Sequence, residues 1–209
     1  MIAVVDYGMG NLHSVAKALE HVAGGQTVVV TSDPAEIAKA DRVVFPGQGA
    51  APDCMRAIDA HGLREAICTA AATRPFLGIC MGLQVLFEHS AEGNTACLGL
   101  FDGDVQRFDQ DMRDAAGERL KVPHMGWNNV RQMGEHPLWD GIADGERFYF
   151  VHSYFVVPQD RAIVAGEADY PAPFTCAVAR DNRFAVQFHP EKSAAAGLHL
   201  LSNFVTWQP

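Results

Sequence analysis

The segment 78–82 reads Gly-Ile-Cys-Met-Gly and places a nucleophilic side chain between two glycines. The spacing Gly-x-nucleophile-x-Gly is that of a nucleophile elbow, a sharp turn between a strand and a helix. An apolar run precedes this turn and a region with helical spacing follows it, which is the context that the motif requires. A helix N-terminus favours a thiolate, and its free N–H groups can bind an oxyanion. We therefore predict that Cys80 is a nucleophile, the alternative being a small apolar residue packed in a turn.

A cysteine nucleophile commonly works with a histidine base that a carboxylate holds in place. Among nine histidines, His189 follows the apolar run 184–188 and therefore lies at a strand end, with Glu191 two residues on. The Glu191 carboxylate can accept a hydrogen bond from the second ring nitrogen and fix the tautomer. His152, near another strand end, is the second candidate base, and His124 lies in a loop.

His-x-Glu can also supply two metal ligands, so a metal site is an alternative interpretation of residues 189–191. The sequence has no His-x-x-x-His pair and no cluster of Cys and His, and we predict no metal. Gly8-Met9-Gly10 resembles the start of a dinucleotide-binding fingerprint, but His13 occupies the place of the third glycine. We therefore predict no nucleotide cofactor.

The sequence Pro-Gly-Gln-Gly at 46–49 follows a third apolar run, which should end at the same sheet edge as the elbow. Two glycines around one residue allow a peptide to turn its N–H toward a developing oxyanion. We predict that Gly47 and Gln48 contribute such a group, together with the backbone of Met81 after the nucleophile. The alternative is an ordinary loop between a strand and a helix.

The elements that must position these residues alternate in the first half of the chain. Apolar runs at 2–5, 27–30, 42–45 and 76–79 predict strands, and the segments 12–22, 51–72 and 81–89 predict helices, with a short one opening at 34. Asn11 is the expected N-cap of the first helix, and Gly62 is expected to break the second. This alternation indicates parallel βαβ units in one sheet.

The second half of the chain changes character and predicts successive strands. They are expected at 105–108, 128–130, 147–152, 162–165, 175–179 and 184–188, followed by a helix at 193–207. The polar segment 109–118 predicts a surface hairpin or loop. The expected fold is therefore α/β, with a largely parallel central sheet and an antiparallel extension. Without repeats or a linker, the chain is expected to form one domain over 1–209.

The composition limits the partners and the compartment. With 209 residues, 48% of them hydrophobic, the chain is the size of one soluble domain, and its net charge of −9 repels phosphate backbones, so nucleic acid is not an expected partner. No apolar run approaches the roughly 20 residues that span a bilayer, and the start of the chain does not resemble a signal peptide. Five scattered cysteines indicate reduced thiols, and we expect a cytoplasmic protein.

The combination of Gly-x-Cys-x-Gly with a distant His-Pro-Glu resembles the class I glutamine amidotransferases, over essentially the whole chain. Four further segments make it similar to the glutaminase subunits of imidazole glycerol phosphate synthase. These segments are Asp-Tyr-Gly-Met-Gly-Asn at 6–11, Pro-His-Met-Gly-Trp-Asn at 123–128, Phe-Val-His-Ser-Tyr at 150–154 and His-Pro-Glu-Lys-Ser at 189–193. Each is common alone, but the four in this order are specific.

This resemblance implies a flavodoxin-like amidotransferase fold and a triad of Cys80, His189 and Glu191. It implies hydrolysis of glutamine without a cofactor. The ammonia passes to a cyclase of (β/α)₈-barrel form, which makes imidazole glycerol phosphate and an aminoimidazole carboxamide ribotide in histidine biosynthesis. By matching motif, the residues around glutamine would be Gly49, Met81, Gln84, Ser153 and Tyr154. The residues facing the partner in the heterodimer would be Asn11 and Lys192.

One segment departs from the family pattern, in which Pro-Gly-Val-Gly is followed by a bulky side chain. Here Gln48 replaces the valine and Ala51 is small, but a backbone N–H does the chemistry, so the reaction should survive. The glutaminases of pyridoxal phosphate synthase and of anthranilate synthase are alternatives, and Lys192 and the opening segment 6–11 argue against both. A docking subunit without catalysis is a further alternative, against which the intact Cys80, His189 and Glu191 argue.

Overall fold

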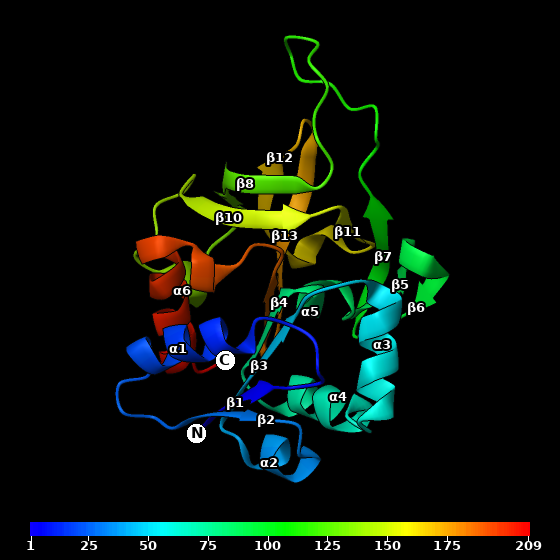
Figure 1. The fold of residues 1–209 in the computed structure, drawn as a ribbon. Coiled ribbons are helices and arrows are strands. Elements are labelled where there is room, and N and C mark those ends of the chain that lie inside the picture. The colour runs from blue at the N-terminus through cyan, green and yellow to red at the C-terminus, as the bar shows by residue number, and fades with distance from the viewer.

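A computed structural model describes all 209 residues, and a sheet of twelve strands runs through its centre (Figure 1). Five adjacent strands of this sheet are parallel, in the order β2-β1-β3-β4-β14. They are β1 (Ile2–Val5), β2 (Val28–Thr31), β3 (Arg42–Gly47), β4 (Phe76–Cys80) and β14 (Arg183–Val186). Counted along the chain, this is the flavodoxin-like order 2-1-3-4-5. The predicted α/β class is confirmed.

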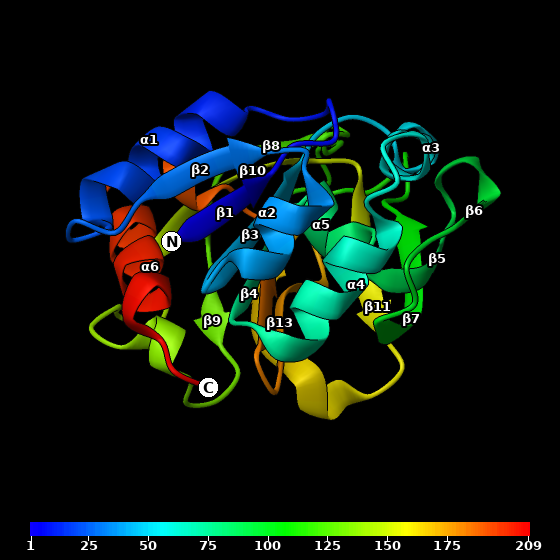
Figure 2. The same ribbon diagram turned by 90° about the horizontal axis from the view of Figure 1, so that it is seen from below.

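Helices cover both faces of the parallel strands. The helices are α1 (Leu12–Val22), α2 (Pro34–Lys39), α3 (Ala51–Ala60), α4 (Arg64–Thr73), α5 (Met81–Gln84) and α6 (Ala194–Thr206). One hydrophobic core lies beneath α1 and α6, and a second lies beneath α2, α3 and α4 on the other face (Figure 2). Because both faces are covered, β1 and β4 are buried along their whole length and their sequences are continuously apolar.

The antiparallel extension begins where β13 pairs with β14. Its strands in the sheet are β13 (Pro173–Arg180), β11 (Tyr154–Pro158), β7 (Phe101–Arg107), β5 (Phe87–Ser90), β6 (Thr95–Ala96), β12 (Val164–Asp169) and β9 (Arg131–Gln132). Their pairings are antiparallel except that between β5 and β7, which is parallel. A separate antiparallel ribbon joins β8 (His124–Asn129) to β10 (Arg147–His152). Between β7 and β8 the chain projects from the body (Figure 1), and a single bridge joins Arg113 to Arg119. This projection confirms the surface hairpin or loop expected at 109–118.

The helix predicted for 81–89 is wrong beyond Gln84. The chain instead turns into β5, where Phe87 is fully buried and pairs with Phe101 of β7. This pairing with a strand later in the chain outweighs the local helical spacing. Several strand boundaries also move. Strand β7 begins at Phe101 rather than at 105, and β8 begins at His124, a residue expected in a loop, because it pairs with β10 along its whole length. The segment 161–163 is a 3-10 turn before β12, and the last strand ends at Val186 rather than at 188.

Three parallel strands end at one edge of the sheet, and each leads into a segment predicted to carry chemistry. Strand β3 ends at Gly47 and β4 ends at Cys80, and these two residues are register partners. Strand β14 leads to His189. Ligand sites of open α/β sheets lie outside the carboxyl ends of such strands.

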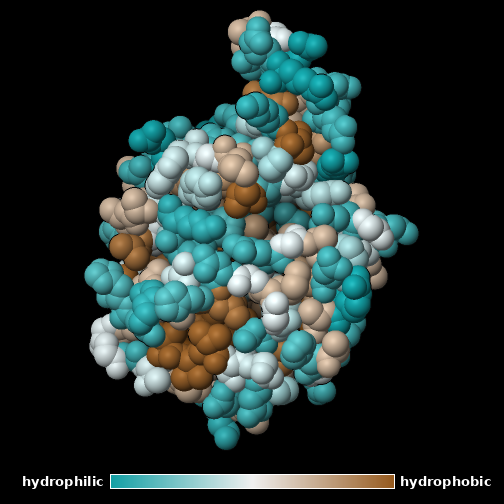
Figure 3. Space-filling view, viewed as in Figure 1, coloured by the Kyte–Doolittle hydropathy of each residue, from teal (hydrophilic) through white to brown (hydrophobic).

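None of the helices is both long enough and apolar enough to span a membrane. The face seen in Figure 3 is largely hydrophilic, and its largest apolar area lies between α1 and β2.

Candidate active site

Cys80 occupies a strained turn between β4 and α5. Its backbone has φ 57° and ψ −111°, a region that residues with a side chain rarely adopt. The neighbouring glycines are sterically required, because a Cβ on Gly82 would lie 1.8 Å from the carbonyl oxygen of Phe45. A Cβ on Gly78 would likewise lie 2.8 Å from the carbonyl oxygen of Gly82. The sequence Gly-x-Cys-x-Gly therefore folds here as the sharp turn that a nucleophile elbow needs.

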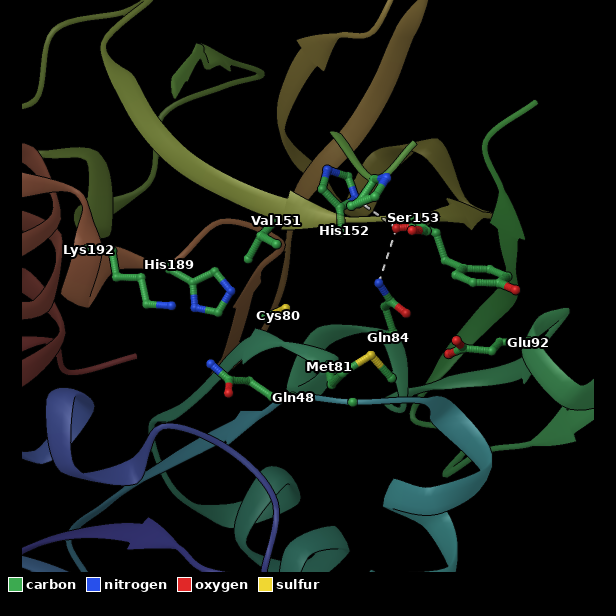
Figure 4. Close-up of a pocket in the computed structure, with 13 residues that line it drawn as sticks. Gln48, Cys80, Met81, Gln84, Glu92, Val151, His152, Ser153, His189 and Lys192 are labelled. Carbon is green, nitrogen blue, oxygen red and sulfur yellow. Dashed lines mark hydrogen bonds between the residues drawn. The ribbon is translucent and has the colours of Figure 1, made fainter. Parts of the chain in front are cut away.

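His189 and Glu191 form a hydrogen-bonded pair whose side chains are almost completely buried. The ring Nδ1 lies 2.8 Å from a carboxylate oxygen of Glu191. Since a carboxylate accepts, Nδ1 carries the proton, and Nε2 is left for other chemistry. Nε2 is buried and has no hydrogen-bond partner in the structure. His189 and Cys80 line the same pocket, as Figure 4 shows.

The electrostatic setting of His189 favours its protonated form. Burial alone would lower the pKa of its ring, but the neighbouring Cys80 and the Glu191 carboxylate outweigh burial and raise that pKa to about 10. An imidazolium beside the sulfur stabilises negative charge there. It also holds a proton that can pass to a leaving group.

The pocket has a volume of about 430 Å³ and opens beside the sulfur of Cys80. All five residues predicted to surround glutamine line it: Gly49, Met81, Gln84, Ser153 and Tyr154. The other lining residues are Gln48, Cys80, Glu92, Pro123, Val151, His152, His189 and Lys192. In Figure 4 the side chain of Lys192 lies beside His189 at one end of the site, and Glu92 lies at the other.

A network of amides connects the far wall of the pocket to the nucleophile. The Gln84 side chain is only 2% exposed, and its Nε2 donates to the carbonyl of Tyr154 at 3.1 Å and to Oε1 of Gln187 at 2.9 Å. The Gln187 amide in turn lies 3.7 Å from the sulfur of Cys80. Oε1 of Gln84 is buried without a partner. An unpaired buried acceptor at a pocket wall can receive a hydrogen bond from a ligand.

The segment after β3 passes close to the elbow. A Cβ on Gly47 would lie 2.2 Å from the hydroxyl oxygen of Tyr7 and 2.8 Å from Cβ of Met81, so only glycine fits. The next carbonyl, that of Gln48, accepts a hydrogen bond from the thiol of Cys54 at 3.4 Å. Burial raises the pKa of Cys54 to about 11, so this thiol keeps the proton that it donates. The backbone of the predicted oxyanion segment is thus held from two sides.

The second candidate base, His152, has no free ring nitrogen. Nδ1 lies 2.7 Å from the carbonyl oxygen of Tyr154, and Nε2 lies 2.9 Å from Nδ1 of His124. Burial lowers the pKa of His152 to about 3. The ring lines the pocket, yet both of its nitrogens are occupied within the protein. The geometry therefore favours His189 over His152 as the base.

The two residues predicted to face a partner lie close to the same site. Asn11 caps α1 by accepting from the backbone N–H of Ser14 at 3.4 Å, as the sequence predicts. Asn11 also lines a narrow crevice together with Gly47, Gln48, His189 and Glu191.

Across the chain, no three His, Cys, Asp or Glu side chains are grouped to hold a metal ion.

Sequence reasoning missed Glu92, Pro123, Val151 and Gln187, all of which lie at or next to the pocket. Gln187 gives a usable signal, because it is a polar residue inside the apolar run that leads to His189. Glu92 gives none, since it lies in a 3-10 turn, Glu92–Asn94, that follows the mispredicted helix.

Comparison with known proteins identifies the family of this chain. The family model described as "Glutamine amidotransferase class-I" matches residues 3–207. The chain belongs to the class I glutamine amidotransferase family. Two relatives from this family are each named imidazole glycerol phosphate synthase subunit HisH. The one from Thiobacillus denitrificans is 72% identical over 209 residues, covering 100% of this chain and 92% of the relative. The one from Dechloromonas aromatica is 69% identical, covering 100% of this chain and 97% of the relative.

Solved structures share the fold at much lower sequence identity. A structure described as a glutamine amidotransferase matches with a TM-score of 0.72 at 15% identity, covering 98% of this chain and 99% of that one. PurLQS from Thermotoga maritima matches with a TM-score of 0.70 at 19% identity, covering 97% and 96%. These likenesses confirm the class I amidotransferase fold predicted from the sequence.

Proposed function

We propose that this chain hydrolyses glutamine to glutamate and ammonia. The ammonia would pass to a cyclase subunit of (β/α)₈-barrel form, which makes imidazole glycerol phosphate and an aminoimidazole carboxamide ribotide in histidine biosynthesis. The observation that carries the proposal is the strained Cys80 elbow in one pocket with the His189–Glu191 pair. The names of the relatives, which are subunits of imidazole glycerol phosphate synthase, support the acceptor reaction.

In this mechanism the thiol proton of Cys80 passes to Nε2 of His189, and the sulfur attacks the carboxamide carbon of glutamine and forms a C–S bond. The tetrahedral oxyanion would be stabilised by backbone N–H groups of Gln48 and Met81, whose segments flank the sulfur. His189 donates a proton as the C–N bond breaks, and ammonia leaves. The same ring then accepts a proton from the water that hydrolyses the thioester, which releases glutamate and restores the thiol. Glu191 keeps the ring in the required tautomer.

The shape and charge of the pocket suit an amino acid that carries a side-chain amide. With the carboxamide at Cys80, the α-ammonium would extend toward the Glu92 carboxylate at the other end of the site (Figure 4). One oxygen of Glu92 already accepts from the backbone N–H of Ala51 at 2.8 Å, which orients the carboxylate. The unpaired Oε1 of Gln84 would accept from an N–H of glutamine, and backbone N–H groups of Ser153 and Tyr154 would donate to the α-carboxylate.

We further propose that the partner docks beside Asn11 and Lys192 and controls the oxyanion segment. Both residues lie next to the triad and one of them, Asn11, shares a crevice with Gly47 and Gln48. The isolated chain should therefore have low glutaminase activity, and the cyclase with its ligand should activate it. Lys192→Ala should weaken this activation, whereas Lys39→Ala on the exposed surface of α2 should not. An isolated chain as fast as the complex would contradict this control. The whole span 1–209 would act as one cytoplasmic amidotransferase domain.

The deciding experiment compares native protein with Cys80→Ala in the complex with the cyclase. Glutamine-dependent turnover should fall by at least about 10⁴-fold, because a methyl group cannot form the thioester. The synthase reaction supplied with free ammonia should persist, which shows that the complex is intact. The matched control is Cys68→Ala, which removes a half-buried thiol on α4 away from the pocket. Retained glutamine turnover in Cys80→Ala would refute the proposed function.

A further inference from the structure

Two buried histidines face each other across the β8–β10 ribbon. His124 and His152 are register partners, are 4% and 6% exposed, and approach to 2.9 Å between Nδ1 of His124 and Nε2 of His152. Aromatic rings enclose the pair: Tyr170 stacks on His124 with ring centroids 4.1 Å apart, and the rings of Phe108 and Phe174 pack against both histidines. The proposed reaction assigns no step to either ring.

One backbone carbonyl determines where the protons of this pair lie. The oxygen of Tyr154 can only accept, so Nδ1 of His152, 2.7 Å away, carries a proton. Burial lowers the pKa of His152 to about 3, so at neutral pH its Nε2 is an acceptor. Nδ1 of His124 must therefore donate to it. Burial also lowers the pKa of His124 to about 4, which leaves Nε2 of His124 as an acceptor.

Asn128 lies at the other end of this series of hydrogen bonds, and its contacts independently require the same tautomers. Oδ1 of Asn128 accepts from the backbone N–H of Asn129 at 2.8 Å, and Nδ2 donates to the carbonyl of Asp169 at 2.9 Å. The amide orientation is thus fixed by two backbone groups. The same Nδ2 lies 3.3 Å from Nε2 of His124, to which it can only donate. Both ends require the Nδ1–H tautomer in both rings.

This chain of hydrogen bonds ends at the pocket. The Tyr154 carbonyl accepts a second hydrogen bond, from Nε2 of Gln84 at 3.1 Å, and both Ser153 and Tyr154 line the pocket. Two donors within the protein hold this oxygen, which belongs to the peptide between Tyr154 and Phe155. The preceding peptide is held separately, because the Ser153 carbonyl accepts from the backbone N–H of Phe108 at 3.0 Å. The histidine pair therefore fixes the carbonyl of Tyr154 and, through the shared oxygen, the amide of Gln84.

We propose that His124 and His152, both in the Nδ1–H tautomer, are positioning residues that hold the Tyr154 carbonyl and, through it, Gln84 ready for bound glutamine. The role rests on the proposed function, since the substrate in question is glutamine. The pair acts through Tyr154 and touches no reacting atom. It should therefore affect binding of glutamine more than the chemical step.

The tautomers can be measured directly in the ¹⁵N-labelled full chain by two-bond ¹H–¹⁵N correlation of the histidine rings. Both rings should be neutral at neutral pH, with the proton on Nδ1. His124→Phe and His152→Phe assign the two signals. An Nε2–H tautomer or an imidazolium in either ring would overturn the proposal. This measurement needs no turnover, so it stands apart from the proposed function.

Steady-state kinetics in the complex with the cyclase separate the effect of losing the hydrogen-bond donor of His124 from the effect of losing its ring. His124→Phe keeps the aromatic packing but removes the donor, which leaves Nε2 of His152 unpaired, and KM for glutamine should rise about tenfold with a smaller change in kcat. His124→Asn keeps a donor near the position of Nδ1 and should restore much of the loss. The ammonia-dependent synthase reaction should be unchanged in both. An unchanged KM in His124→Phe, or equal losses in both variants, would overturn the proposal. A native complex that turns over no glutamine would instead refute the proposed function.

Discussion

The contact between Gly47 and Tyr7 offers a sharp test of how the oxyanion segment is held. A Cβ on Gly47 would meet the Tyr7 hydroxyl oxygen at 2.2 Å, well inside the 3.0 Å that real Cβ atoms keep. The Tyr7 ring is fully buried and packs against the tilted ring of Phe45 with centroids 5.4 Å apart, so it cannot move aside freely. Gly47→Ala should therefore destabilise the protein by about 1–3 kcal/mol through overpacking.

Tyr7→Phe removes the oxygen that the new methyl group would strike. Alone, this change loses only a long hydrogen bond to the Cys54 sulfur, at 3.9 Å, and should cost about 0.5–1 kcal/mol. In the Gly47→Ala background the same change should restore stability, giving a coupling of about 1 kcal/mol or more. The rescue is partial, because Cβ of Met81 still lies 2.8 Å from the added methyl group.

Urea unfolding of the four proteins in this cycle measures the coupling, and glutaminase assays with the cyclase report the effect on catalysis. If the displaced segment no longer presents an N–H to the oxyanion, kcat should fall about 10²- to 10³-fold in Gly47→Ala. Strictly additive free energies of unfolding would refute the idea that Tyr7 forms the wall against Gly47. Native kcat in Gly47→Ala would refute the role of the segment in catalysis.

The remaining predictions concern the triad and the buried histidines. His189→Ala should impair glutamine hydrolysis nearly as much as Cys80→Ala does. Glu191→Gln should be milder, because it disturbs only the orientation and charge of the His189 ring. Equal losses of steady-state kcat in His189→Ala and Glu191→Gln would contradict this ranking. Burial lowers the pKa of His124, His136 and His152 to about 4, about 4 and about 3. The unfolded chain then binds more protons than the folded one below about pH 6.5, so stability should fall as pH drops toward 4. The slope should reach at most about 1.4 kcal/mol per pH unit for each of the buried His124 and His152 rings, and less for the half-buried His136, which water screens. Urea unfolding across this range checks the slope, and a stability independent of pH would contradict it.

That Cys80, His189 and Glu191 lie together could be predicted because each of their segments depends on local sequence. The elbow needs two glycines around Cys80 and a buried strand before it, and the apolar run before His189 marks the end of another strand. Parallel strands buried on both faces produce apolar runs that are visible without any alignment. The order of the five parallel strands then brings these segments to one edge of the sheet.

The parts that could not be predicted depend on contacts between residues far apart in the chain. The segment after Gln84 has helical spacing, but Phe87 pairs with a strand that begins at Phe101. The His124–His152 pair arises from the register of a ribbon whose strands are separated by a long loop. The wall that Tyr7 forms against Gly47 likewise joins two loops that follow different strands. No local pattern specifies such pairs.

The central claim, that Cys80 is the nucleophile, is tested most directly by the site of covalent labelling. Of the five cysteines, Cys80 is the one that lines the pocket. Burial raises the pKa of Cys54 and of Cys97 to about 11, so both remain unreactive thiols at neutral pH. An electrophilic glutamine analogue should add one equivalent to the complex with the cyclase. Peptide mapping by mass spectrometry should find it on Cys80, with free glutamine protecting. Label on Cys54 instead, or labelling that glutamine does not slow, would contradict the claim.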